Sequence, residues 1–291
     1  MKSVLEAAGL RVPRHARCAT AAGVREAAEA IGYPIIVKPI AGAGSADTHR
    51  VNDAAELEDV IPRLGRVPQV SVEEFVDAEE FTFDTICAGG RVLFHNICWY
   101  RPRPLVARQL EWISPQTIVL KDTGVDYLAG GRAMGMAVLE ALGFRDGFTH
   151  MEWYRRPDGE VVFGEIGARP PGARTVDIMN FSADTNLYAR WAEAVTRGEF
   201  SEPVERRYNV ASIFKRAQGQ GRIQHVEGLG ALMAEFGEHV AALELLPIGA
   251  PRRNWLQTLI SDGMVIVRHP DLDGCLEIAG RFASDLRLHA G

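Results

Sequence analysis

Apolar residues along the chain fall into two patterns, short continuous runs and longer stretches with helical spacing. The alanine-rich segment 20–31 predicts a helix that Thr20 caps and Gly32 ends. Segment 33–39 is a short apolar run that closes on a proline, which predicts a buried strand. In segment 53–64 apolar residues recur every three or four positions, which predicts a second helix.

The same two patterns extend through the rest of the chain. At the start of the second helix, Asp53 and Glu56 have the spacing of a capping box. The further strands that the patterns predict are 48–51, 69–76, 80–88, 91–98, 148–154, 160–166, 209–215, 241–246, 255–259 and 264–269. The further helices that they predict are 126–142, 183–196 and 272–286. Strands and helices mixed in this way indicate an α+β fold.

Length and composition narrow the class of protein. The chain has 291 residues, which is enough for two packed units, and a change in composition near 198–203 indicates a boundary. The net charge is -6 and the basic residues are scattered, so we expect no nucleic-acid partner. Since no apolar run approaches the ~20 residues of a spanning helix, we expect no membrane segment. Four isolated cysteines suit a reducing cytoplasm, where we expect the protein to be located.

A lysine and a glycine-rich loop form the first group of residues with candidate chemistry. Lys38 ends the apolar strand, and Gly42, Gly44 and Ser45 follow it. A strand fixes the lysine's direction, and glycines let backbone N–H groups approach phosphate oxygens closely. These residues are therefore candidates for holding a nucleotide's phosphates. An ordinary turn is the alternative, because the loop matches neither the Walker pattern nor G-x-G-x-x-G.

The second group is an acidic link between two predicted strands. Extended backbone at Glu74, Phe75 and Val76 would offer N–H and C=O groups to the edge of an adenine ring. Glu80, four residues further on, would accept hydrogen bonds from ribose hydroxyls. A solvated acidic hairpin is the alternative interpretation of the same residues.

The third group is a pair of glutamates on two strands joined by a tight turn. Because side chains alternate along a strand, Glu152 and Glu165 can lie on the same face of the pair. Two facing carboxylates repel unless a cation lies between them, and hard oxygen ligands suit magnesium. Arg169 follows directly and can stabilise charge on a transferring group. Two exposed glutamates on an edge hairpin are the alternative, which the apolar flank 161–163 disfavours.

In this order and spacing, the three groups resemble the ATP-grasp superfamily over residues 1 to about 198. The resemblance implies an ATP-grasp fold with two α+β subdomains, 1–76 and 77–200, that clasp ATP, and a small C-terminal α+β domain, 201–291. It implies ATP and Mg²⁺ as cofactors. The residues that would bind the nucleotide are Lys38, Gly42, Gly44, Ser45, Glu73, Glu74, Phe75, Val76 and Glu80. Glu152 and Glu165 would bind the metal, with Arg169 and Arg174 as catalytic residues and His150 as a further substrate contact.

The same resemblance implies a reaction. The C-terminal third is similar to that of L-amino acid ligases, which favours small-molecule carboxylate and amine substrates of the amino-acid kind. The expected enzyme is a ligase that joins the two through an acylphosphate and releases ADP and phosphate. Gly167 stands where the superfamily usually has a metal-binding asparagine. This departure supports the alternative, a non-catalytic or degenerate ATP-grasp nucleotide-binding protein.

The start of the chain also departs from the superfamily pattern. An N-terminal domain and an earlier ATP-binding lysine usually precede this region, and Lys2 lies too close to the first residue to be assigned that role. We therefore expect either a truncated start or a partner chain that supplies the domain. A homodimer is the default expectation for the oligomeric state.

Overall fold

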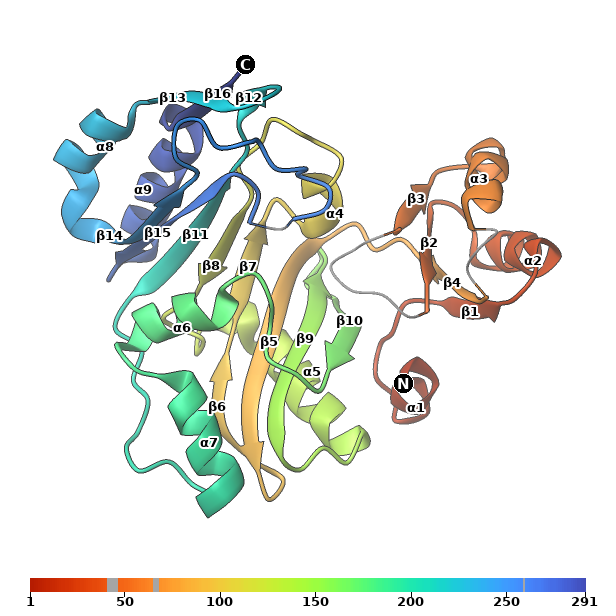
Figure 1. Ribbon diagram of the computed structural model, residues 1–291. Coiled ribbons are helices and arrows are strands. Elements are labelled where there is room, and N and C mark those ends of the chain that lie inside the picture. The colour runs from red at the N-terminus through yellow and green to blue at the C-terminus, as the bar shows by residue number, and fades with distance from the viewer. Residues whose placement is uncertain (41–46, 65–67, 259) are drawn as a thin grey trace.

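The computed structural model describes residues 1–40, 47–64, 68–258 and 260–291. Figure 1 shows a small lobe made by the N-terminal strands and a large lobe built around a long twisted sheet. Helix α1 (Lys2–Ala7) lies between the two lobes, and its Leu5 is fully buried in the core of the large lobe. Among the described helices, none is both long enough and apolar enough to cross a lipid bilayer.

The small lobe is a four-stranded antiparallel sheet with two helices. Its strands are β1 (His15–Cys18), β2 (Ile35–Pro39), β3 (His49–Val51) and β4 (Val70–Glu74), in the order β1-β4-β2-β3. Its helical segments are α2 (Ala21–Ile31), α3 (Ala54–Val60) and η1 (Ile61–Leu64). Apolar residues of the sheet and of the helices form one core, which includes Ala28, Ile35 and Val72, all fully buried. This packing fixes the direction of β2, at whose end Lys38 lies.

The predicted ends of the first two helices are largely confirmed. The Thr20 hydroxyl accepts a hydrogen bond from the Gly23 N–H at 3.1 Å, and Gly32 follows the helix with a φ of 83°. Asp53 accepts from the Glu56 N–H at 2.9 Å, as a capping residue does. The Glu56 carboxylate, however, accepts from the Asn52 N–H, one residue earlier than a capping box requires.

A nine-stranded sheet organises the large lobe in the described part of the chain. Its order is β10-β9-β5-β7-β8-β11-β15-β14, and β6 pairs with β5. The strands are β5 (Glu79–Ala88), β6 (Arg91–Asn96), β7 (Cys98–Arg101), β8 (Gln116–Val119), β9 (Gly147–Arg155), β10 (Val161–Gly167), β11 (Asn209–Lys215), β14 (Val240–Leu245) and β15 (Gly263–His269). All the pairings given for these strands are antiparallel.

Helices cover both faces of this sheet, as Figure 1 shows. One core joins the sheet to α5 (Ala129–Ala141), α8 (Leu229–Phe236) and α9 (Leu272–Asp285). A second core, on the other face, joins it to α6 (Thr175–Ala183) and α7 (Leu187–Arg197). The short segments α4 (Pro104–Ala107), η2 (Asp126–Leu128) and η3 (Gly237–His239) connect larger elements.

A small third sheet lies beside α9 at the C-terminal end. Its order is β12-β16-β13, with β12 (Gln218–Gly219), β13 (Ile223–Glu227) and β16 (Arg287–Ala290). Strand β11, beyond the predicted boundary at residue 201, pairs directly with β8 and β15 in the large sheet. Residues on both sides of that boundary therefore share one sheet, and the division into 1–76, 77–200 and 201–291 stays a prediction.

Two predicted elements were wrong. Segment 183–196 is not one helix, because the chain turns at Asp184, which has a left-handed φ of 46°, and Asn186 caps a new helix, α7. Residues 255–257 form a turn rather than a strand. Strand β15 pairs instead with β14, the strand that precedes it, and with β11 from further back in the chain. The break before α7 has a local cause, the Asn186 cap, whereas the pairing of β15 with β11 depends on tertiary contacts.

Candidate functional site

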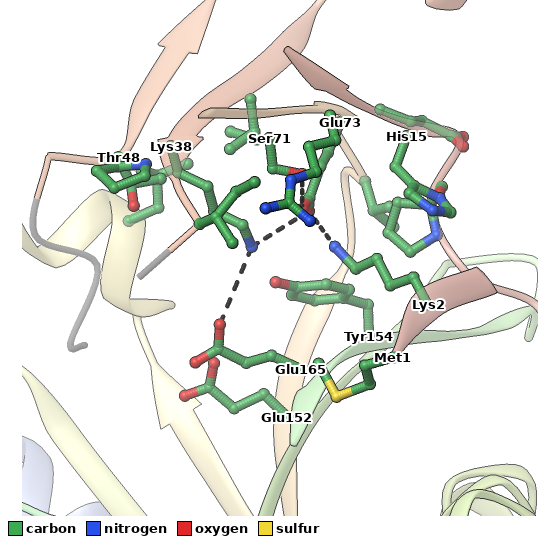
Figure 2. A pocket seen from close by; sticks show the side chains of 18 of the residues that line it. Met1, Lys2, His15, Lys38, Thr48, Ser71, Glu73, Glu152, Tyr154 and Glu165 are labelled. Atoms are coloured by element: carbon green, nitrogen blue, oxygen red, sulfur yellow. Dashed lines mark hydrogen bonds and ion pairs between the residues drawn. The ribbon is translucent and has the colours of Figure 1, made fainter. Parts of the chain in front are cut away.

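The two predicted metal-binding glutamates are neighbours across the β9–β10 pair. A β-bulge between Phe163 and Glu165 brings Glu165 directly opposite Glu152 in the register. Gly164 permits this bulge, because a Cβ atom there would lie only 2.8 Å from the Glu152 carbonyl oxygen. Figure 2 shows both carboxyl groups side by side and directed into the same cavity. The predicted shared face is therefore present.

Lys38 reaches the same cavity from the small lobe. Its Nζ lies 3.2 Å from Glu73 Oε2 and 3.9 Å from Glu165 Oε2 (Figure 2). Burial alone would lower the pKa of Lys38, but the Glu73 and Glu165 carboxylates outweigh that effect and raise it. The lysine therefore stays charged, which a phosphate-binding role requires.

Lys2, which the sequence analysis left unassigned because it lies close to the first residue, becomes a functional candidate in the structure. Helix α1 directs its ammonium group to Glu73 Oε2 at 2.5 Å, and 10% of the side chain is exposed. Burial alone would raise the pKa of Glu73, but the two lysine ammonium groups outweigh it and lower the pKa to about 2. The Glu73 carboxylate thus holds two lysine ammonium groups beside the cavity. The sequence had predicted a different role for Glu73, a backbone contact to adenine.

The remaining residues of the acidic link are held by arginines. Glu74 accepts from Arg11 at 2.9 Å, and the Val76 carbonyl accepts from Arg103 at 2.6 Å. The Phe75 N–H donates to the Pro34 carbonyl at 3.2 Å, and Phe75 lies outside the described residues that line the cavity. Two of the backbone groups expected to meet adenine therefore have partners within the protein. The adenine contact stays a prediction.

Glu80 is buried at the floor of the cavity. Its carboxylate accepts from Arg103 at 3.1 Å, and 5% of its side chain is exposed. Burial and then the negative charge of Glu152 raise its pKa to about 8, because they outweigh the attraction of Arg103. Its assignment to ribose hydroxyls remains a prediction.

A buried polar chain holds Glu152 in place. His150 Nδ1 lies 2.6 Å from Asp84 Oδ1, and its Nε2 lies 3.7 Å from Glu152 Oε1. The Tyr100 hydroxyl donates to the same carboxylate at 3.3 Å. Burial would lower the pKa of His150, but Asp84 and then Glu152 raise it to about 10. His150 therefore supports Glu152 as an imidazolium, whereas the sequence suggested it as a substrate contact.

One cavity of about 370 Å³ lies between the lobes, and its lining includes both lysines, Lys2 and Lys38, and the acidic pair, Glu152 and Glu165. Small-lobe strands and the N-terminal segment supply its cationic side, and β5, β9 and β10 supply its acidic side (Figure 2). The predicted residues that line it are Lys38, Glu73, Glu74, Val76, Glu80, Glu152 and Glu165. Gly42, Gly44 and Ser45 lie outside the described residues.

The two predicted catalytic arginines are elsewhere. Arg169 is exposed, and its guanidinium donates to the adjacent Pro170 carbonyl at 2.9 Å. Arg174 pairs with Asp177 at 2.5 Å and with Glu244 at 2.9 Å. Both lie outside the described residues that line the cavity. Their catalytic roles stay predictions.

The acidic side of the cavity has the donor chemistry that a magnesium ion prefers. Burial and then the charge of Glu152 raise the pKa of Glu165, so the two carboxylates repel each other across the strand pair. A hard divalent cation between them would relieve this repulsion with oxygen ligands from both groups. Glu152 and Glu165 therefore fit Mg²⁺ by type and placement.

Similarity to known proteins extends over more than half of the chain. Residues 1–78 match the family described as carbamoyl-phosphate synthase L chain, ATP binding domain. The chain is 30% identical over 210 residues to the L-arginine-specific L-amino acid ligase of Bacillus subtilis, covering 70% of this chain and 49% of that protein. It is 28% identical over 190 residues to a formate-dependent phosphoribosylglycinamide formyltransferase of Synechocystis, covering 59% and 44%. The chain thus spans about half the length of these curated relatives.

Solved structures give the same result at the level of the fold. The L-amino acid ligase of Bacillus licheniformis superposes with a TM-score of 0.79 at 21% identity, covering 99% of this chain and 70% of that one. N5-carboxyaminoimidazole ribonucleotide synthetase of Thermotoga maritima superposes with a TM-score of 0.72 at 17% identity, covering 100% and 71%. The chain has the ATP-grasp fold. Its sequence is similar to that of an L-amino acid ligase.

Proposed function

We propose that this chain is the catalytic part of an ATP-dependent ligase that joins a small-molecule carboxylate to an amine. The observation that carries the proposal is the cavity in which Lys38 faces Glu152 and Glu165. A cationic side opposite an acidic side is the arrangement that a metal–polyphosphate substrate requires. The likeness to L-amino acid ligases favours substrates of the amino-acid kind.

In the proposed reaction, a carboxylate oxygen of the substrate attacks the γ-phosphorus of ATP. The bond from that phosphorus to the β–γ bridging oxygen breaks, and ADP leaves. The amine nitrogen then attacks the acyl carbon, the bond to the phosphate oxygen breaks, and an amide forms. Phosphate and the proton of the amine are released. The reaction needs no protein nucleophile.

The side chains of the cavity bind and orient the reactants in this proposal. Lys38 holds the phosphates, and Lys2 adds a second ammonium group on the same side. When bound by Glu152 and Glu165, Mg²⁺ supplies neutralisation of phosphate charge. Because His150 and Tyr100 keep the Glu152 carboxylate directed into the cavity, we assign them a positioning role.

A release assay tests this function. Purified protein is incubated with ATP, Mg²⁺ and pairs of amino acids, and ADP, phosphate and amide product are measured together. We expect equal amounts of the three for at least one pair, and dependence on Mg²⁺. A parallel reaction with bicarbonate in place of the carboxylate substrate tests for a carboxylase. Phosphate release with bicarbonate alone would contradict the proposed substrate class.

Gly167 favours a second candidate, a nucleotide-binding protein without turnover. It occupies the position next to the metal-binding pair, opposite His150 in the register, and offers no side-chain donor. A site with one ligand fewer would bind nucleotide with less control over the metal. Tight ATP binding in calorimetry, combined with no ADP release for any substrate pair, would favour this candidate over the ligase.

A further inference from the structure

The third sheet presents an exposed face that is separate from the cavity. In β16, Leu288 is fully buried against the core, so its neighbour His289 points to the opposite face. In β13, Ile223 is buried, and a β-bulge between Ile223 and His225 turns His225 outward. Glu227, two residues further along, lies on the same outer face. The bulge therefore sets three polar side chains on one surface.

These three side chains converge. His225 and His289 are directly opposite in the register, and their rings stack at 4.4 Å with an interplanar angle of 10°. His289 Nε2 lies 3.1 Å from Glu227 Oε2. One ligand atom from each residue lies within 4.8 Å of the other two. Alternate residues on one strand and a cross-strand partner thus bring three potential ligand atoms close together.

We propose that His225, Glu227 and His289 form a zinc-binding site. Two neutral imidazoles and one carboxylate are ligands that Zn²⁺ accepts, with bonds of about 2.0–2.2 Å. A tetrahedral arrangement of such bonds places ligand atoms roughly 3.4 Å apart. To reach it, the two imidazoles must turn out of their nearly parallel stack so that a nitrogen of each ring faces the same ion. Imidazole nitrogens favour Zn²⁺ over Mg²⁺, which distinguishes this site from the acidic cavity.

The surroundings leave the three ligands available. Arg287 is opposite Glu227 in the register, but its guanidinium donates to the Ser284 carbonyl at 3.4 Å. The rest of the outer face is open, since His225 and Glu227 are exposed. A bound ion would tie β13 to β16 and stabilise this end of the large lobe. The proposal does not depend on the ligase function, because the site shares no residue with the cavity.

The test is zinc binding by untagged protein, measured by calorimetry and by the visible absorption of Co²⁺ in its place. We expect one equivalent to bind, a Co²⁺ spectrum typical of tetrahedral coordination, and a higher thermal midpoint with Zn²⁺. The double variant His225→Asn, His289→Asn should weaken binding at least tenfold and remove the midpoint shift. The matched control is His239→Asn, which alters a second histidine pair, His239 and His269, at 5.0 Å.

Each outcome decides the proposal. Loss of binding in the double variant with unchanged binding in His239→Asn supports it. Equal affinity in parent and double variant would overturn it, because the ion would then lie elsewhere. The variant Glu152→Gln shows whether Zn²⁺ also binds in the cavity. It should weaken zinc binding there and leave the site at His225, Glu227 and His289 intact. Absence of any zinc binding by the folded parent would overturn the proposal as well.

Discussion

At the scale of single residues, charged side chains from both lobes meet in the cavity. Lys2 and Lys38 share one partner, Glu73, whereas Glu152 and Glu165 are opposite each other. The nearest cations to this pair are His150, 3.7 Å from Glu152, and Lys38, 3.9 Å from Glu165. These cations leave the repulsion within the pair incompletely compensated, since burial and the charge of Glu152 still raise the pKa of Glu165. This asymmetry favours a ligand that brings both phosphates and a metal.

Lys38→Ala should weaken nucleotide binding. The lysine supplies an ammonium group that faces the acidic pair across the cavity, and an ammonium–phosphate contact contributes about 1.5–3 kcal/mol. We expect at least a tenfold increase in the dissociation constant for ATP in calorimetry. Lys121→Ala is the matched control, because Lys121 donates to the Pro270 carbonyl away from the cavity. Equal affinities in the two variants would mean that Lys38 is structural.

Glu73→Gln should change how stability depends on pH. The folded-state pKa of Glu73 is lowered from 4.5 to about 2, so its ion pairs stabilise the protein above pH 4.5 and are lost as pH falls towards 2. The free energy of unfolding of the parent should exceed that of the variant by roughly 3 kcal/mol near pH 6, because of the size of this pKa shift. This difference in free energy should shrink below pH 4. Urea unfolding across this range measures it.

Exposed Glu6 on α1 provides the comparison for that experiment. Glu6→Gln removes a carboxylate from the same helix as Lys2 without touching the Lys2–Glu73–Lys38 cluster. We expect this variant to follow the parent at every pH. A difference between parent and Glu73→Gln that stays constant from pH 3 to pH 7 would show that the ion pairs do not carry the effect.

At the scale of elements, a bulge and two glycines determine how the site is built. The bulge at Gly164 aligns the two glutamates, as described above. Helix α5 packs closely against β9 and β5. A Cβ atom at Gly131 would overlap Trp153 of β9, and one at Gly135 would overlap Phe83 of β5. Close packing of this helix supports β5 and β9, the strands that carry Glu80 and Glu152.

Gly135→Ala should destabilise the protein although alanine favours helices. The added methyl group must displace the Phe83 ring in a filled core, which costs about 1–3 kcal/mol. Gly280→Ala in α9 is the matched comparison, since nothing lies within 4 Å of the position of its Cβ. There we expect stabilisation by up to about 1 kcal/mol. Denaturant unfolding measures both, and the same sign for both would contradict the packing described here.

Local sequence patterns predicted most of the elements around the site. Helices α2 and α9, the β5–β6 hairpin and the β9–β10 pair were predicted within a few residues, because their caps, turns and periodicity lie within each segment. Strand alternation suggested a shared face for Glu152 and Glu165, but their alignment depends on the bulge at Gly164, which was not predicted. In an unbroken register Gly164 would lie opposite Glu152. Pairing of β11 with β8 and β15 could not be predicted, since those partners lie about 90 and 50 residues away in the chain.

The roles of individual side chains were harder to predict. Lys2 was set aside because it lies close to the first residue, and the sequence does not show that its partner is Glu73, which belongs to another element. His150 was assigned to a substrate because the sequence does not show Asp84 on the neighbouring strand, opposite it in the register. Charge partners across strands and between lobes appear only when the fold is known.

At the scale of the whole molecule, the two lobes each supply half of the site. The small lobe and α1 provide the lysines, and the large sheet provides the carboxylates (Figure 1). Neither lobe alone has the chemistry to hold a metal–nucleotide complex. We therefore propose that ATP and its metal ion bind between the lobes and that the acidic pair makes them reactive.

ADP release by parent and Glu165→Gln, at saturating ATP and Mg²⁺ with the best substrate pair, tests this claim most directly. Because the substitution keeps the size of the side chain but removes its charge, we expect the variant to remain folded, with an unchanged circular dichroism spectrum and a thermal midpoint close to that of the parent. We expect its ADP release to fall at least a hundredfold, in the range found when one group that stabilises transition-state charge is removed (about 10²–10³). Equal ADP release by the folded variant and the parent would contradict the account.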